Sequence, residues 1–279
     1  MIFVTGDTHG EFTRFSTRGF AEQRFLSKDD CVIILGDFGG VWNPGGQTKS
    51  EEYWLDWLED KPFTTLFLDG NHENFDRLNA EFPEAEWRDG RVHAVRPSVL
   101  HLQRGEIYDL DGHSFLVFGG ARSHDIQDGV LERDDIRIRE WRRRDRLFRV
   151  NRVSWWEEEM PNGLEMERAL ANLEHHGNSV DFVLTHTPPS SFLARLKELG
   201  PPAGDSAIEP SDVLTEFLEG IRLKAKYKLW LCGHMHKCSF SREDRIQVLD
   251  EYGIYELDGL VNGCEGFDLD LGWVNPQPL

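Results

Sequence analysis

The sequence predicts an α/β protein, and three features of the chain support this prediction. Short apolar runs typical of buried strands recur along its length, and several of them stop at a polar residue flanked by glycine. Segments with the apolar spacing of a helix face lie between these runs. The run at residues 31–35 is apolar throughout, as is usual for a strand covered on both faces. We therefore expect sheet and helices to be packed in layers.

Composition limits the kinds of partner that the chain can have. The 279 residues carry a formal net charge of -19, and 39% of them are hydrophobic. Such a field repels polyanions, so we do not expect binding of nucleic acid or anionic membranes over the whole surface. The same acidity also fits a protein that binds cations, although plain solubility explains it as well. The length is compatible with one large domain or two small ones.

Nothing in the sequence predicts export or a membrane span. The first predicted strand begins at residue 2, which leaves no room for a signal peptide. No run approaches the roughly 18 apolar residues of a transmembrane helix. The cysteines have no spacing typical of a disulfide framework. They are Cys31, Cys232, Cys238 and Cys264. We expect a cytoplasmic protein without membrane contacts.

In the first half of the chain, short apolar runs predict strands and i, i+3, i+4 spacing predicts helices. A helix is predicted over residues 11–26 because Phe12, Phe15, Phe20 and Phe25 can share one face. A second helix at 51–59 has Ser50 as its candidate cap, and a short one follows at 74–80. The predicted strands are 2–5, 31–35, 64–68, 98–102, 106–110 and 114–118.

The second half resumes the alternation of strands and helices. A helix is predicted at 163–175, with Leu164, Leu170 and Leu173 on its apolar face, and another at 211–223 after a Pro/Gly loop at 201–204. Strands are predicted at 180–185 and 228–232. Two further runs, 246–249 and 254–257, flank a short polar segment and predict an antiparallel pair.

Between these halves lies a segment of different composition. Residues 133–152 contain nine arginines but four acidic residues, and tryptophans lie in or beside them. We interpret the chain as a single domain, 1–279, with an arginine- and tryptophan-rich insertion at about 121–160. The arginines can either bind an anionic substrate or pair with neighbouring acids such as Asp134, Asp135 and Glu157.

Polar side chains follow the predicted strands at the points where these end. The carboxyl ends of strands in an open α/β sheet meet along one edge, so these side chains are expected to converge. Residues two apart in an extended loop can point to the same side, which fits Asp7 with His9 and His234 with His236. The predicted metal ligands are Asp7, His9, Asp37, Asn71, His186, His234 and His236.

The ligand types indicate which metals the site prefers. Carboxylate, amide and imidazole donors without thiolate suit manganese, iron or zinc in an open site, and we expect two divalent ions, with manganese preferred. A structural zinc site made by Cys232 and Cys238 with the intervening histidines would leave Asp7 and Asn71 without a role. The remaining histidines are expected to be solvated loop residues. They are His93, His101, His113, His175 and His176.

Five short motifs resemble, in order, the signatures of the calcineurin-like metallophosphoesterases. They are DTH at 7–9, GD at 36–37, GNHE at 70–73, TH at 185–186 and GHMH at 233–236. The resemblance implies a β-sandwich of two mixed sheets flanked by helices. It also implies that Asp37 bridges two ions. One ion would be held by Asp7, His9, Asp37 and His236, and the other by Asp37, Asn71, His186 and His234.

The resemblance further implies hydrolysis of a phosphoester by direct attack of a metal-bridging hydroxide. His72, which is not a ligand in similar enzymes, would protonate the leaving oxygen or bind the phosphate. Protein phosphatases of this superfamily carry an arginine in the motif GD-x-x-D-R-G, which residues 36–41 lack. Arg122 is our main candidate for the missing phosphate contact, with the arginines of 133–152 as alternatives, and His124 lies near enough in sequence to assist.

Three functions remain open on the sequence alone. The first is a phosphomonoesterase that acts on a small molecule or a phosphoprotein. The second is a phosphodiesterase or nuclease, in which the arginine-rich segment holds a nucleotide or a single strand. The third is a metal-bound scaffold without turnover. The presence of His72 weighs against the scaffold, because a binding protein has no need of a proton donor.

Overall fold

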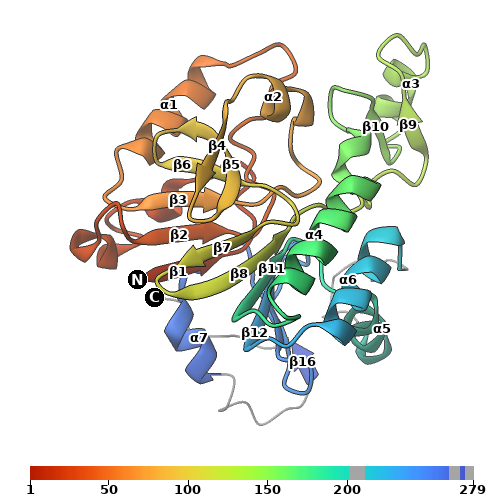
Figure 1. Ribbon diagram of the computed structural model, residues 1–279. Helices are drawn as coiled ribbons and strands as arrows, with labels where there is room; N and C mark the ends of the chain where they lie inside the picture. Colours follow the sequence, from red (N-terminus) through yellow and green to blue (C-terminus); the bar gives the residue numbers. More distant parts are fainter. Residues whose placement is uncertain (201–210, 264–270, 274–279) are drawn as a thin grey trace.

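The computed structural model describes residues 1–200, 211–263 and 271–273 of the chain. Two large mixed sheets pack face to face, and helices cover their outer faces (Figure 1). This confirms the predicted α/β class and the sandwich of two mixed sheets. The predicted loop at 201–204 and Cys264 lie outside the described residues. No helix in the described part of the chain is long and apolar enough to cross a membrane.

The first sheet has a parallel centre and antiparallel edges. Strands β1, β2, β3 and β6 run parallel, while β15 at one edge and the β4–β5 hairpin at the other run antiparallel to their neighbours. The strands in spatial order are β15 (Tyr255–Glu256), β1 (Ile2–Thr5), β2 (Cys31–Ile34), β3 (Thr64–Phe67), β6 (Val99–Leu102), β5 (Gly90–Arg96) and β4 (Glu84–Trp87).

The second sheet is built in the same way. Strands β8, β11, β12 and β14 run parallel, and the other three are antiparallel to their neighbours. The strands in spatial order are β16 (Leu271–Trp273), β13 (Ser239–Ser241), β14 (Ile246–Val248), β12 (Leu229–Cys232), β11 (Phe182–Thr185), β8 (His113–Phe118) and β7 (Ile107–Leu110).

Helices cover both outer faces, α1 and α2 on the first sheet and α4, α5 and α6 on the second (Figure 1). Strand β9 (Gly129–Leu131) pairs with β10 (Phe148–Val150) in a separate two-stranded sheet, which lies with α3 away from the large sheets. The helices are α1 (Lys49–Glu59), α2 (Phe75–Ala80), α3 (Ile138–Arg143), α4 (Gly163–His175), α5 (Ser190–Leu199), α6 (Val213–Lys224) and α7 (Leu257–Gly263).

Alternation of side chains along each central strand explains the uninterrupted apolar runs. In β1, Ile2 and Val4 belong to the core between the two sheets, whereas Phe3 packs in the core beneath α1. In β2, Ile33 faces the second sheet while Val32 faces the helices. A strand that is buried on both faces favours apolar side chains at successive positions, which the continuous runs of β1 and β2 reflect.

The single helix predicted at 11–26 is wrong. The segment forms two short 3₁₀ helices instead, η1 (Thr13–Phe15) and η2 (Ala21–Phe25). Phe12, Phe15 and Phe20 are buried as expected, but Phe25 is 75% exposed. The break falls at Gly19, where a Cβ atom would lie 2.5 Å from the carbonyl oxygen of Arg14. This close backbone approach does not fit a continuous helix.

Two details of the predicted helices also differ. Thr48, not Ser50, caps α1: its hydroxyl accepts from Glu51 N at 3.1 Å, and the Glu51 carboxylate accepts from Thr48 N at 2.8 Å. This reciprocal capping box begins the helix two residues earlier than expected. In α4, Leu173 is buried as predicted, but Leu164 is 73% exposed and Leu170 is 36% exposed. The buried residues of this helix are Ala169 and Leu173, so the predicted apolar face is only partly correct.

The antiparallel pair predicted from 246–249 and 254–257 is wrong. Strand β14 pairs with β12 and β13 in the second sheet, while β15 pairs with β1 in the first. The chain crosses between the sheets at Asp250, whose Oδ1 accepts from the N–H groups of Tyr252 and Gly253. A tight turn between apolar runs looks like a hairpin in sequence, although here the runs enter different sheets.

The expectation that His93 and His101 are solvated loop residues is wrong. They lie on β5 and β6, are 6% and 5% exposed, and their Nδ1 atoms are 3.0 Å apart. Both line a cavity of about 610 Å³. The hairpin that carries His93 was missed because Arg88 and Asp89 form its turn with positive φ angles of 48° and 68°, positions at which Asn-Gly is the usual signal.

Candidate metal centre

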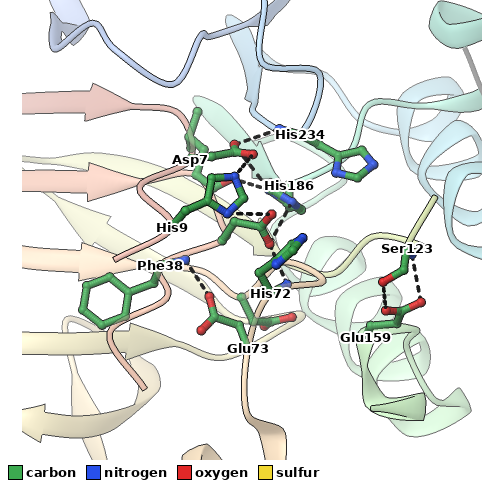
Figure 2. A network of polar contacts seen from close by, with 12 residues as sticks. Asp7, His9, Phe38, His72, Glu73, Ser123, Glu159, His186 and His234 are labelled. Carbon is green, nitrogen blue, oxygen red and sulfur yellow. Dashed lines mark hydrogen bonds and ion pairs between the residues drawn. The ribbon is translucent and has the colours of Figure 1, made fainter. Parts of the chain in front are cut away.

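The loops that follow five strands, three in the first sheet and two in the second, bring polar side chains to one edge of the sandwich. Figure 2 shows the side chains of Asp7, His9, His72 and His186 directed toward one another from these loops, with the backbone of His234 next to Asp7. Asp7 and His9 follow β1, Asp37 follows β2, Asn71 and His72 follow β3, His186 follows β11, and His234 and His236 follow β12.

One group of donor atoms forms around Asp7. Its Oδ2 lies 3.0 Å from Nε2 of His236 and 3.6 Å from Nε2 of His9. The Nε2 atoms of these two histidines are 3.2 Å apart. Donor atoms of all three residues lie within 4.8 Å of one another, close enough to hold one ion between them.

A second group forms around Asp37 and His186. The imidazole Nε2 of His186 lies 3.3 Å from Asp37 Oδ1, and its Nδ1 lies 2.7 Å from the carbonyl oxygen of Leu35. Asp7 completes this group from the other side. A third group joins Asp37 to His9 and His72. Asp37 is thus common to two groups, as Asp7 and His9 are, and the third group includes His72, which we did not expect to be a ligand.

The backbone holds these side chains in unusual conformations. The N–H of His72 donates to Asp37 Oδ1 at 2.8 Å, and the N–H of His234 donates to Asp7 Oδ1 at 2.9 Å. The φ angles of four site residues are positive, in the left-handed region that non-glycine residues rarely adopt. They are 47° at His9, 47° at Asp37, 65° at His234 and 54° at His236. Such strain concentrates at functional sites.

The charges of the buried groups are strongly coupled. Burial by itself raises the pKa of Asp7 and Asp37, but the neighbouring imidazoles, above all His186, outweigh it and hold the pKa of both carboxyls well below the usual range. Burial lowers the pKa of His186, but Asp37 and Asp7 outweigh it and raise this pKa to about 9. His186 must therefore lose a proton before Nε2 can bind a metal.

Asn71 Oδ1 is buried and has no hydrogen-bond partner among the described residues. Asp7 Oδ2 and His186 Nε2 are also buried, and their nearest polar neighbours belong to the same site: His236 Nε2 at 3.0 Å and Asp37 Oδ1 at 3.3 Å. A buried amide oxygen is rarely left unpaired, because it loses its hydration without compensation. Amide, carboxylate and imidazole donors are also the types that divalent transition-metal ions accept. The residues present therefore fit a metal site.

The family model for calcineurin-like phosphoesterases matches residues 1–238. The chain belongs to the calcineurin-like phosphoesterase family. No curated protein matches the chain. The protein is accordingly a metal-dependent hydrolase of phosphoesters, and the clustered donor atoms are its candidate metal ligands.

Three of the predicted residues of this phosphoesterase lie less centrally. His234 is in none of the three donor groups; its ring centroid is 4.9 Å from that of His186, and burial, with His186, lowers its pKa to about 3. His124 is exposed, with its ring 5.6 Å from that of His234. Arg122 is exposed and makes no hydrogen bond or ion pair with any residue in the described ranges.

His72 of the phosphoesterase lies among aromatic and charged neighbours. Trp42 stacks on its ring at 5.7 Å, and the His9 ring meets it edge-on at 5.0 Å. Burial lowers the pKa of His72 to about 4; Asp37 raises it and Arg149 lowers it. The imidazole is therefore neutral at pH 7. Arg149 Nη2 lies 3.2 Å from His72 Nε2, so the guanidinium donates and Nε2 accepts.

Two other residues contact the site in ways that the sequence did not specify, although Arg149 was among the arginines of 133–152 considered for the phosphate contact. Glu73 is fully buried, and its Oε1 accepts from Phe38 N at 2.6 Å, which holds the turn after Asp37 (Figure 2). The GNHE motif contains this glutamate but does not reveal its partner. Arg149 is one of nine similar arginines, and no feature of the sequence distinguishes it from the others.

Proposed function

We propose that this phosphoesterase hydrolyses a phosphomonoester, on a small molecule or a phosphoprotein, with two divalent ions. The observation that supports this most is Asn71 Oδ1, an amide oxygen that is buried without a hydrogen-bond partner in the described part of the chain. It directly follows Gly70, which packs against the candidate ligands Asp37 and His186. Manganese is the preferred metal and the cytoplasm the preferred location in this proposal.

Each ion takes its ligands from both sheets. The first would be held by Asp7, His9, Asp37 and His236, and the second by Asp37, Asn71, His186 and His234. When bound, the two ions supply an activated water and neutralise charge on the phosphoryl oxygens. The hydrogen bonds from His72 N to Asp37 and from His234 N to Asp7 fix the carboxylates before any ion arrives.

His72 acts on the substrate and not on the metals in this proposal. As a neutral imidazole whose Nε2 accepts from Arg149, it carries its proton on Nδ1 and can donate a hydrogen bond to a phosphoryl or leaving-group oxygen. The stacked indole of Trp42 restrains the ring, which keeps the donor directed.

The second candidate is a phosphodiesterase or nuclease, and one observation favours it. Helix α3 and its flanks present arginines to solvent, where Arg139, Arg142 and Arg143 have no acidic partner in the described part of the chain. Such a surface could hold the backbone of a nucleotide or single strand. The metal-bound scaffold is the third candidate.

A substrate panel with Mn²⁺ separates the three. Turnover of p-nitrophenyl phosphate supports the monoesterase, turnover of bis-p-nitrophenyl phosphate or a cyclic nucleotide supports the diesterase, and no turnover of any substrate supports the scaffold. In parallel, His72→Ala is expected to keep two equivalents of metal and lose roughly 10²- to 10⁴-fold in kcat. His113→Ala, which removes a half-exposed imidazole of β8, is the matched control. Full turnover by His72→Ala would contradict the role of His72.

A further inference from the structure

Arg149 is the one arginine of the 121–160 segment for which the structure gives a contact with a site residue. Its side chain, on β10, is 13% exposed, and its guanidinium has three neighbours. Nε donates to Asp125 Oδ2 at 2.7 Å, Nη1 donates to the carbonyl oxygen of Ser154 at 2.9 Å, and Nη2 reaches His72 Nε2 at 3.2 Å. The guanidinium is thus held through Nε and Nη1 by residues of its own segment, while Nη2 is directed toward His72.

The segment that carries Arg149 is itself seated against the site. Asp76 on α2 accepts from Trp156 Nε1 at 2.9 Å and pairs with Arg152. The Trp156 ring packs edge-on against Trp42 at 5.5 Å, and Trp42 stacks on His72. These contacts, made by residues that follow β10, hold the segment with Arg149 against the loop that carries His72.

The present partner of Nη2 is a weak one for a guanidinium. A neutral imidazole nitrogen offers one lone pair and no charge, whereas the planar fork of arginine matches the paired oxygens of a phosphate. Asp125 neutralises the inner edge of the guanidinium, and its Oδ1 is buried without a partner. The edge that carries Nη2 is left to bind an anion beside the His72 ring, on its Nε2 side.

We propose that Arg149 binds the unesterified oxygens of the substrate phosphoryl group and makes the site selective for phosphomonoesters over diesters, with Asp125 as its positioning residue. This inference rests on the proposed function. Arg149 takes the part that the arginine of GD-x-x-D-R-G would play, from a different segment of the chain, because residues 36–41 have no arginine. Arg122, the first candidate from the sequence, has no such anchor.

Selectivity follows from the charge and the number of free oxygens. A phosphomonoester carries a charge of about -1.5 to -2 at pH 7 and three free oxygens. A diester carries one charge and two free oxygens. Two metal ions and one arginine together can bind three free oxygens. A diester has only two, so loss of the arginine removes a contact that a monoester makes and a diester does not.

The test compares Arg149→Met with Arg149→Lys, Asp125→Asn and the control Arg144→Met. Arg144 is on the same segment, is 66% exposed and pairs with Glu140 one helical turn away. Binding of inorganic phosphate to the metal-loaded protein is measured by calorimetry, and kcat/KM is measured on p-nitrophenyl phosphate and on bis-p-nitrophenyl phosphate. Metal content and thermal unfolding are recorded for every variant.

Arg149→Met is expected to weaken phosphate binding and monoester kcat/KM by roughly ten- to a hundredfold, the range for a charge-assisted hydrogen bond. Diester kcat/KM should change little, so the ratio of the two falls. Arg149→Lys should recover part of the phosphate affinity because it keeps the charge. Asp125→Asn should raise KM for the monoester with a smaller effect on kcat, and Arg144→Met should match the wild type.

Equal phosphate affinity in Arg149→Met and the wild type would overturn the inference and leave the proposed function intact. A parallel loss on both esters, with reduced metal content or thermal stability, would also overturn it, because Arg149 would then only hold β10 in place. If the wild type hydrolyses no phosphomonoester, the proposed function fails by itself. The calorimetric comparison still decides whether Arg149 binds phosphate.

Discussion

Gly70 lies directly against the carboxylate of Asp37, with no space for a side chain between them. A Cβ atom on Gly70 would be 2.1 Å from Asp37 Oδ1 and 2.6 Å from His186 Nε2. Asp37 cannot retreat easily, because the same Oδ1 accepts from His72 N at 2.8 Å. The glycine of GNHE is therefore required by the packing of two candidate ligands and not by a turn.

Gly70→Ala is expected to displace Asp37 and to lower the metal content by at least one equivalent, measured by plasma mass spectrometry after remetallation. Gly220→Ala on α6 is the matched control, because nothing lies within 4 Å of its added methyl group. The control should keep its metal and gain up to about 1 kcal/mol in unfolding free energy. A Gly70→Ala protein with two equivalents would contradict the assignment of Asp37 as a shared ligand.

Glu73 is expected to tolerate glutamine but not leucine. Burial and the nearby Asp37 raise the pKa of Glu73 well above its usual value, so the native carboxyl is protonated while the unfolded one ionises above about 4.5. The unfolding free energy of the wild type should therefore fall as the pH rises above about 4.5. Glu73→Gln cannot ionise, so its unfolding free energy should lack this pH dependence. Glu73→Leu leaves Phe38 N–H without an acceptor and should cost about 1–3 kcal/mol in urea unfolding. Equal stability of both variants would argue against this role.

The buried pair of Arg104 and Asp69 should be costly to break. Their side chains are 4% and 2% exposed, and Arg104 Nε donates to Asp69 Oδ2 at 2.9 Å. Burial raises the pKa of Asp69, but Arg104 and His101 outweigh it and keep this carboxyl ionised. Arg104→Met should lower the unfolding free energy by about 3–5 kcal/mol, because it leaves a buried charge unpaired.

The control for this pair is Arg96→Met, which breaks an ion pair with the exposed Asp56 and should cost about 1 kcal/mol or less. Chemical denaturation at pH 7 measures both variants. Similar losses in the two would mean that water reaches the Arg104 pair.

His93 should make the protein less stable in acid. Burial, with the neighbouring His101, lowers the pKa of His93 to about 4, although Glu84 and Asp69 raise it. Between this value and 6.5 the unfolded imidazole binds a proton that the native one does not, so stability falls as the pH falls. The loss reaches up to about 3 kcal/mol near pH 4. His93→Gln should flatten the profile of unfolding free energy between pH 6.5 and 4, and an unchanged slope would contradict this assignment.

The central strands and the site they carry were predictable for one physical reason. A strand buried on both faces favours an apolar run, so the ends of the runs in β1 and β2 indicate that Asp7 and Asp37 lie in the loops that follow. Because these strands are parallel, the loops that follow them lie at the same edge of the sheet, and this needs no further signal in the sequence. The sequence therefore predicted which side chains gather, although the role of each one stays a prediction.

The failures have physical causes as well. Pairing of β15 with β1 brings Phe3 against Glu256 and Val4 against Tyr255, from opposite ends of the chain, which no local pattern encodes. The burial of His93 depends on a hairpin with an unusual turn, and that of Glu73 on the hydrogen bond that it accepts from the N–H of Phe38. Arg149 differs from its eight neighbouring arginines only through tertiary structure, because Asp125 and Ser154 hold it in place.

The candidate ligands come from both halves of the sandwich. Asp7 and Asp37 extend from the first sheet, and His186 and His236 from the second, so that neither half holds a complete set. A bound ion would link the two sheets at this edge of the sandwich. Chelation should therefore destabilise the contact between the sheets before it affects either sheet. Amide hydrogens of the loops that carry the ligands should exchange faster, while those at the centres of the strands should stay protected. The hydrolytic machinery and the cohesion of the two halves would in this way depend on the same few atoms.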